Sequence, residues 1–206
     1  FTSLMYDGSA LPYGENLATT AAIVRAAHPC GVPVEAELGQ VFRSEDAVTQ
    51  EQVQDSMTDP SLAADFVRRS GCDSLAIAVG SVHAMQAREA ELDQERIRAC
   101  AAAVDVPLVL HGSSGVKDES IRQAVQNGIC KINVGTYIAA GFTETIRAEA
   151  CARPSEFDPR KVLAPARDEV KRRVQEKIRL FGSSGRASLV RTGTGLCERS
   201  GFAAIE

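Results

Sequence analysis

The stretch 106-VPLVLHGSSGVKDES-120 joins a short apolar run to a helix-like run through a turn of small residues. The apolar run Pro107–Leu110 is too short for a helix and predicts a strand, which ends at His111. Gly112–Gly115 then predicts a turn, and Asp118 predicts the cap of the helix that follows. A strand, a turn and a helix in this order form the repeating unit of an α/β fold with parallel strands.

The same unit recurs along the chain in both directions. Further strands are predicted at Thr2–Tyr6, Val32–Glu37, Ser74–Val79 and Cys130–Val134. Helices are predicted at Asn16–Ala27, from Asp59-Pro60 to Gly71, from Asp93 to Ala103, from Asp118 to Gly128, and at Arg160–Leu180 after Asp158-Pro159. Parallel strands joined by helices take right-handed crossovers, and strands that are apolar throughout fit a sheet that helices cover or one that closes as a barrel.

Composition excludes several classes of protein. The 206 residues are 44% hydrophobic and 24% charged, with a net charge of −4, which argues against disorder and against a nucleic-acid surface. The six cysteines include no C-x-x-C pair, which favours reduced thiols in the cytoplasm. No apolar run approaches the roughly 18 residues that a membrane span needs, so we expect no membrane partner.

Polar residues follow the predicted strands, where the active sites of parallel α/β barrels lie. These residues are Asp7, Glu37, His83, His111 and Asn133. A single histidine after a strand is more often a hydrogen-bonded loop residue than a ligand. Two histidines on adjacent strand ends, with carboxylates on the next two, form a set that a divalent metal such as zinc could use. A third protein ligand is then missing or comes from Glu37.

The turn Gly112–Gly115 suggests a phosphate site, because small residues let backbone N–H groups converge beside a helix N-terminus. Asn133–Thr136 is a candidate for the neighbouring wall of that site. The alternative is that the glycines and serines only make turns.

Seven stretches resemble, in order and spacing, the class II (metal-dependent) ketose-bisphosphate aldolases, which act on fructose and tagatose 1,6-bisphosphates. They are SLMYDGSALPYGENL (3–17), GVPVEAELG (31–39), TDPSLAADFV (58–67), GCDSLAIAVGSVH (71–83), VPLVLHGSSGV (106–116), GICKINVGT (128–136) and FDPRKVLAPARDEVKRRVQEKIRLFGSSGRA (157–187). The resemblance covers about residues 1–187. It implies a TIM (β/α)8 barrel of which strands four to eight and a C-terminal helix are present, followed by a loosely ordered tail at 188–206.

In this family zinc is held by three histidines, of which the resemblance assigns two to His83 and His111. Asp7 and Glu37 match acidic positions that line the metal site. The resemblance assigns phosphate binding to Ala84, where the family usually has glycine, and to Gly112, Ser113, Ser114, Asn133, Val134, Gly135 and Thr136. Glu45, beside Asp46 in the loop 39–48, matches an acidic pair implicated in proton transfer.

The resemblance implies zinc-assisted aldol cleavage of a ketose bisphosphate to dihydroxyacetone phosphate and glyceraldehyde 3-phosphate, by a homodimer or homotetramer. The family's third zinc histidine and its catalytic Asp lie on a strand that we expect to precede Phe1. Two hypotheses therefore remain: a zinc-dependent aldolase, or a non-catalytic remnant that binds sugar phosphates. The choice between fructose and tagatose bisphosphate stays open.

Overall fold

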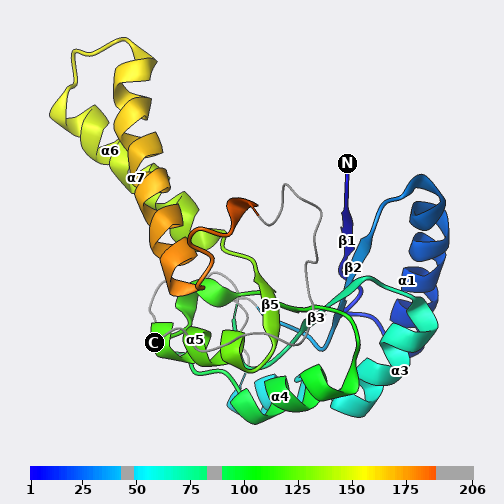
Figure 1. The fold of residues 1–206 in the computed structure, drawn as a ribbon. Coiled ribbons are helices and arrows are strands. Elements are labelled where there is room, and N and C mark those ends of the chain that lie inside the picture. The colour runs from blue at the N-terminus through cyan, green and yellow to red at the C-terminus, as the bar shows by residue number, and fades with distance from the viewer. Residues whose placement is uncertain (43–48, 83–89, 189–206) are drawn as a thin grey trace. The chain divides into compact units, whose positions relative to one another are not determined.

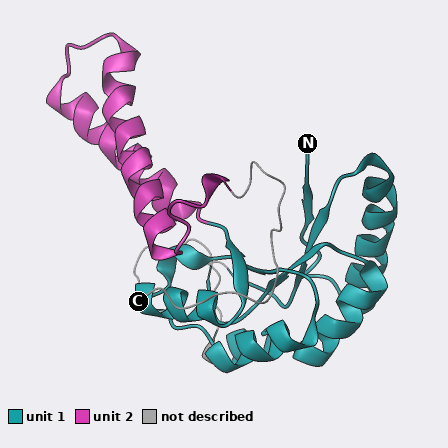
Figure 2. Ribbon diagram, in the orientation of Figure 1, with its two compact units in different colours: residues 1–133, 197–206 teal, residues 134–196 magenta. Residues whose placement is uncertain are grey.

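The computed structural model describes residues 1–42, 49–82 and 90–188. These residues form two compact units, and the boundary between the two lies between Asn133 and Val134 (Figure 2). The first unit is a sheet covered by helices, and the second is a pair of helices.

The sheet of the first unit has five parallel strands in the order β1-β2-β3-β4-β5. The strands are β1 (Leu4–Tyr6), β2 (Val34–Leu38), β3 (Ser74–Ile77), β4 (Leu108–Leu110) and β5 (Ile129–Ile132). Each predicted strand is therefore confirmed, with ends that lie within two residues of the prediction. Sequential order with parallel pairing is the topology of consecutive βα units.

Helices α1 (Tyr13–Ala27), α3 (Pro60–Ser70), α4 (Gln94–Ala103) and α5 (Asp118–Gln126) lie side by side along the sheet (Figure 1). The core lies between these helices and the strands, and its largest fully buried apolar side chains are Phe66, Leu75, Ile77, Ile97, Leu108, Leu110 and Ile121. Two 3₁₀ turns, η1 (His28–Cys30) and η2 (Ser113–Gly115), follow α1 and β4. A six-residue helix, α2 (Gln50–Asp55), is not predicted by the sequence pattern, because it has a capping box but no apolar periodicity.

The predicted helix caps are mostly confirmed. The Asp59 carboxylate accepts hydrogen bonds from the amides of Ser61 and Leu62, and Asp93 accepts one from the amide of Arg96. The prediction that Asp118 is the N-cap of α5 is wrong, because Lys117 is the N-cap and Asp118 is the first helical residue. There its charge stabilises the helix through the dipole without capping an amide.

Strand β2 departs from the prediction that every strand is apolar throughout. All five of its residues are buried, although two of them are glutamates. Because side chains alternate along a strand, Val34, Ala36 and Leu38 share one face while Glu35 and Glu37 share the other. On β2, this second face therefore carries two buried carboxylates.

A contact across the sheet shows that it is curled. The Lys131 Nζ of β5 lies 2.6 Å from the Glu35 Oε2 of β2, although two strands separate them in the sheet. A flat sheet with neighbouring strands about 4.8 Å apart would place β2 and β5 more than 14 Å from each other. The five strands are thus a curved part of a (β/α)8 barrel, and the expected fold class is confirmed.

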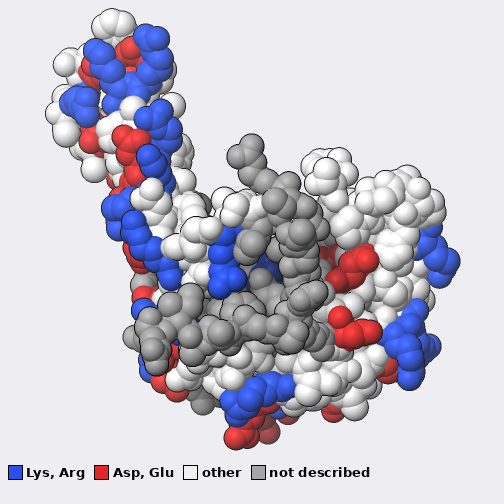
Figure 3. Space-filling view, in the orientation of Figure 1, with Lys and Arg blue, Asp and Glu red and all other residues white. Residues whose placement is uncertain are grey.

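The second unit consists of α6 (Thr136–Ala152), which the sequence analysis did not predict, and α7 (Pro159–Leu180), which it did. Asp158 caps α7 through the amide of Arg160. Acidic and basic side chains are interspersed over the helix pair (Figure 3). Within the described residues, no helix is both long enough and apolar enough to cross a membrane.

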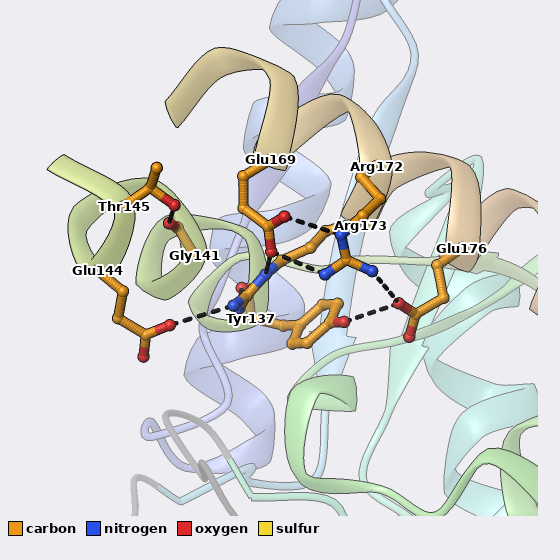
Figure 4. A network of polar contacts seen from close by, with 8 residues as sticks. All are labelled: Tyr137, Gly141, Glu144, Thr145, Glu169, Arg172, Arg173 and Glu176. Atoms are coloured by element: carbon orange, nitrogen blue, oxygen red, sulfur yellow. Dashed lines mark hydrogen bonds and ion pairs between the residues drawn. The ribbon is translucent and has the colours of Figure 1, made fainter. Parts of the chain in front are cut away.

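One arginine joins the two helices. Arg173 of α7 donates hydrogen bonds to the carbonyl of Tyr137 at 2.6 Å and to Glu144 at 3.1 Å, both on α6 (Figure 4). Its guanidinium also lies 4.6 Å from the centre of the Tyr137 ring. Glu169 on its own helix accepts a further bond from its Nε, so that the charge is neutralised where it is buried.

Candidate active site

The candidate site is built around His111, which follows directly after β4 at the carboxyl end of the sheet. It is 7% exposed and lies between two glutamates of β2. Its Nε2 lies 3.0 Å from Glu35 Oε1, and its Nδ1 lies 2.9 Å from Glu37 Oε2. Both ring nitrogens therefore face carboxylate oxygens.

Residues of β5 and of the segment after it complete the cluster. Lys131 Nζ lies 2.6 Å from Glu35 Oε2, so that the two oxygens of Glu35 bind two different cationic side chains. Asn133 Nδ2 lies 3.0 Å from His111 Nε2. Side chains from β2, β4 and β5 meet here because the sheet curls, with Glu35 and Lys131 separated by 96 positions in sequence.

The surroundings shift the protonation of the two central groups. Burial by itself lowers the pKa of the His111 imidazole, but its contacts with Glu35 and Glu37 outweigh burial and raise the pKa to about 9. Burial likewise raises the pKa of the Glu35 carboxyl, and the hydrogen bonds from His111 and Lys131 outweigh it and lower that pKa. In the protein without a bound cation, His111 is therefore an imidazolium at neutral pH.

Glu37 forms the second ion pair of His111. Its side chain is 2% exposed, and its Oε2 lies 2.9 Å from His111 Nδ1. A buried carboxylate is stabilised by such a cationic partner, and carboxylate oxygen is also a ligand type that divalent metals take.

The backbone of Glu37 is held by Asn16 of α1, whose Nδ2 donates to the Glu37 carbonyl at 2.9 Å. Asn16 is 1% exposed, and its Oδ1 accepts a hydrogen bond from the Thr20 hydroxyl. Gly8, at the end of β1, leaves room for this amide: a Cβ at Gly8 would lie 2.3 Å from Asn16 Oδ1. The ends of β1 and β2 are thus both packed against one buried asparagine.

The turn after His111 has the compact form that its small residues predict. Gly112 takes a positive φ of 67°, which a residue with a side chain rarely adopts, and Ser113, Ser114 and Gly115 are buried. The Ser113 hydroxyl donates to the Asn133 carbonyl at 2.8 Å, so that this turn is tied to the end of β5. The Ser113 hydroxyl proton is therefore used within the protein.

The other predicted site residues follow β1, belong to the second unit or lie outside the described residues. The Asp7 carboxylate is exposed and accepts hydrogen bonds from the amide and hydroxyl of Ser9, which closes a turn after β1. Val134, Gly135 and Thr136 belong to the second unit, where Gly135 is the N-cap of α6. The remaining predicted residues, His83, Ala84 and Glu45, lie outside the described residues.

The donor atoms present suit a metal such as zinc, which binds imidazole nitrogen and carboxylate oxygen. Within residues 1–42, 49–82 and 90–188, no group of three or more His, Cys, Asp or Glu side chains is arranged to hold a metal. Of that donor set, the described residues bring together His111 and the Glu37 carboxylate, which lie 2.9 Å apart.

Sequence reasoning missed Glu35, Lys131 and Asn16 as members of the site. The alternation Glu35-Ala36-Glu37 was a sufficient signal for Glu35, since residues two apart on a strand share a face. No local signal pairs Lys131 with a residue 96 positions away, and Asn16 resembles any polar residue near the start of a helix.

Comparisons with known proteins show the family to which the chain belongs. The family model of class-II fructose-bisphosphate aldolase matches residues 1–186. A probable fructose-bisphosphate aldolase of Bacillus subtilis is 43% identical over 187 residues, which are 91% of this chain and 65% of that protein. A fructose-bisphosphate aldolase of Geobacillus stearothermophilus is 42% identical, with the same two coverages.

Among solved structures, the YdjI aldolase from Escherichia coli K12 superposes with a TM-score of 0.75 at 39% identity, over 91% of this chain and 63% of that one. The chain thus spans slightly less than two thirds of the length of these relatives.

Proposed function

Because this chain belongs to the class II fructose-bisphosphate aldolase family, we propose that the protein catalyses metal-dependent aldol cleavage of a ketose 1,6-bisphosphate to dihydroxyacetone phosphate and glyceraldehyde 3-phosphate, and the reverse condensation. The observation that carries the proposal is His111, held at the carboxyl end of a parallel sheet between two buried glutamates. Such an edge is where barrel enzymes place their chemistry.

The metal in this proposal is Zn²⁺, held by His111 with His83 and with Glu37 and Asp7 as acidic neighbours. The Glu37 carboxylate 2.9 Å from His111 supports this assignment, because imidazole and carboxylate are both ligand types of zinc. A bound zinc ion would supply Lewis-acid polarisation of the substrate ketone. Glu35 orients the imidazole of His111 from the side, as partners of metal-binding histidines commonly do.

The phosphate groups of the substrate are assigned to two turns. In the first unit, the turn Gly112–Ser114 presents a left-handed glycine and buried serines after β4. In the second unit, α6 begins without a side-chain cap and without an acidic residue in its first turn, so that the positive end of its dipole favours an anion. We assign Asn133 to Thr136 to phosphate binding, with Ala84 as a further contact. Glu45 is the proposed group for proton transfer at the substrate hydroxyl.

An aldolase assay with and without a chelator tests the proposal on both fructose and tagatose 1,6-bisphosphates. We expect cleavage that EDTA removes and Zn²⁺ restores, and that His111→Ala abolishes. His28→Ala is the matched control, since His28 is exposed at the end of α1 and pairs with Asp73.

Binding of dihydroxyacetone phosphate without any cleavage, with Zn²⁺ present, would instead support the alternative, a non-catalytic sugar-phosphate-binding protein. Absence of both cleavage and binding would reject both functions.

We further propose a homodimer or homotetramer in the cytoplasm, with sugar phosphates as the small-molecule partners and no nucleic acid or membrane. Among the described residues, Cys30, Cys72, Cys100 and Cys151 are free thiols, which supports a reducing compartment. Sedimentation at several concentrations measures the oligomeric state.

A further inference from the structure

Thr58 occupies a structural position that the proposed chemistry does not use. It begins the Thr58-Asp59-Pro60 motif that starts α3, and its hydroxyl bonds to the backbone at the end of β2 and not to His111 or the glutamates. It is nonetheless 1% exposed, which is unusual for a threonine that precedes a helix cap. Its polar atoms reach the carboxyl ends of two neighbouring strands.

All three polar groups of Thr58 are bonded. The hydroxyl donates to the Leu38 carbonyl at 2.5 Å, at the end of β2, and accepts from the Ala78 amide at 2.8 Å, just beyond β3. The backbone amide of Thr58 donates to the Ala78 carbonyl at 3.0 Å. Its carbonyl accepts a hydrogen bond from Arg96 of α4.

The Thr58 hydroxyl thus takes the place of the next backbone hydrogen bond between β2 and β3. Pairing between β2 and β3 ends at Leu38 and Ile77, and beyond that pair the Thr58 hydroxyl joins the two strands in place of a direct backbone bond. Gly39 makes room for it, with a φ of 80° and with a would-be Cβ only 2.6 Å from Thr58 Oγ1. The strands are therefore held apart at a fixed spacing where they leave the sheet.

The strand ends that Thr58 holds also carry the metal-binding side chains. Glu37 precedes Leu38, and the Asn16 amide holds the carbonyl of Glu37 on the other side. Resting on the metal site proposed above, we infer that Thr58 is a positioning residue: its hydroxyl sets the spacing of β2 and β3 and thereby the position of the Glu37 carboxylate for the metal.

Two substitutions separate the hydroxyl from the shape of the side chain. Thr58→Val keeps the shape and removes the hydroxyl, whereas Thr58→Ser keeps the hydroxyl. The measurement is the dissociation constant of Co²⁺ for the 206-residue chain, followed by the visible absorption of the bound ion. We expect Thr58→Val to weaken Co²⁺ binding about tenfold, as loss of outer partners of metal ligands does, and Thr58→Ser to bind within about twofold of the unchanged protein.

Ser70→Ala is the matched structural control. The Ser70 hydroxyl is also buried and also accepts a backbone amide, that of Cys72, but it lies before the amino end of β3. Its loss should lower the melting temperature and leave the Co²⁺ affinity unchanged. If Thr58→Val fails to fold, Gly39→Ala, which retains the hydroxyl and displaces it, should give the same loss of affinity.

Unchanged Co²⁺ affinity in Thr58→Val, or an equal loss in Ser70→Ala, would overturn the role of Thr58 and leave the metal site intact. Failure of the unchanged chain to bind Co²⁺, or binding that His111→Ala does not reduce, would reject the proposed metal site, and the inference with it.

Discussion

At the scale of single residues, the central feature of the molecule is an imidazolium between two carboxylates. The pKa of His111 is about 9 in the folded protein, above its ordinary 6.5, because contacts with Glu35 and Glu37 outweigh burial. A group whose pKa is raised by folding stabilises the protein fully below its unfolded pKa, and this stabilisation is lost as the pH rises through the folded pKa.

The free energy of unfolding of the metal-free protein should therefore fall by about 1–3 kcal/mol between roughly pH 6.5 and pH 9. Urea denaturation in a chelator at a series of pH values measures this. Glu35→Gln removes one of the two carboxylates that raise the pKa, so it should flatten the profile. A profile with the same slope in Glu35→Gln would show that another group titrates.

At the scale of elements, the pair α6 and α7 depends on a glycine for its packing. A Cβ at Gly141 of α6 would lie 2.2 Å from the Nε of Arg173, whose side chain is only 15% exposed. Alanine is the better helix former by about 1 kcal/mol, but overpacking of a filled contact costs about 1–3 kcal/mol. We expect Gly141→Ala to be destabilising, because displacing Arg173 also breaks its hydrogen bond to the Tyr137 carbonyl.

Gly14→Ala in α1 is the matched comparison, because no atom lies within 4 Å of a Cβ placed there. It should leave stability unchanged or raise it by up to about 1 kcal/mol. Thermal melts of the two variants show whether helix propensity or packing controls stability at Gly141. If Gly141→Ala were as stable as Gly14→Ala, the role given to Arg173 would be wrong.

At the scale of the whole molecule, the proposed metal ligands come from different strands, which meet when the sheet is curled. A metal that needs these ligands therefore binds the folded state and not the unfolded state. Zn²⁺ at about 100 times its dissociation constant should then add about 2.7 kcal/mol to the free energy of unfolding. Calorimetry with and without Zn²⁺ would record this as a higher melting temperature. An equal shift in His111→Ala would mean that the metal binds elsewhere.

Much of the fold could be predicted from the sequence. The five strands and the caps at Asp59, Asp93 and Asp158 follow from local patterns, because run length, turn residues and capping side chains act over a few positions. Helix α6 was missed, since it buries only Gly141 completely and thus lacks a clear apolar stripe. The positions of His111 and Glu37 at strand ends could be predicted for the same local reasons, and the predicted roles of Glu45, His83 and Ala84 stay predictions.

The sequence by itself therefore determined a parallel α/β fold, the family and the strand ends at which the chemistry is proposed. The tertiary structure decided which side chains meet there: Glu35 with both His111 and Lys131, Asn16 with Glu37, and Thr58 with the ends of β2 and β3. The reason is physical. Caps, turns and strand alternation depend on neighbours in sequence, whereas these contacts depend on the curvature of the sheet, to which the packing of all its strands and helices contributes.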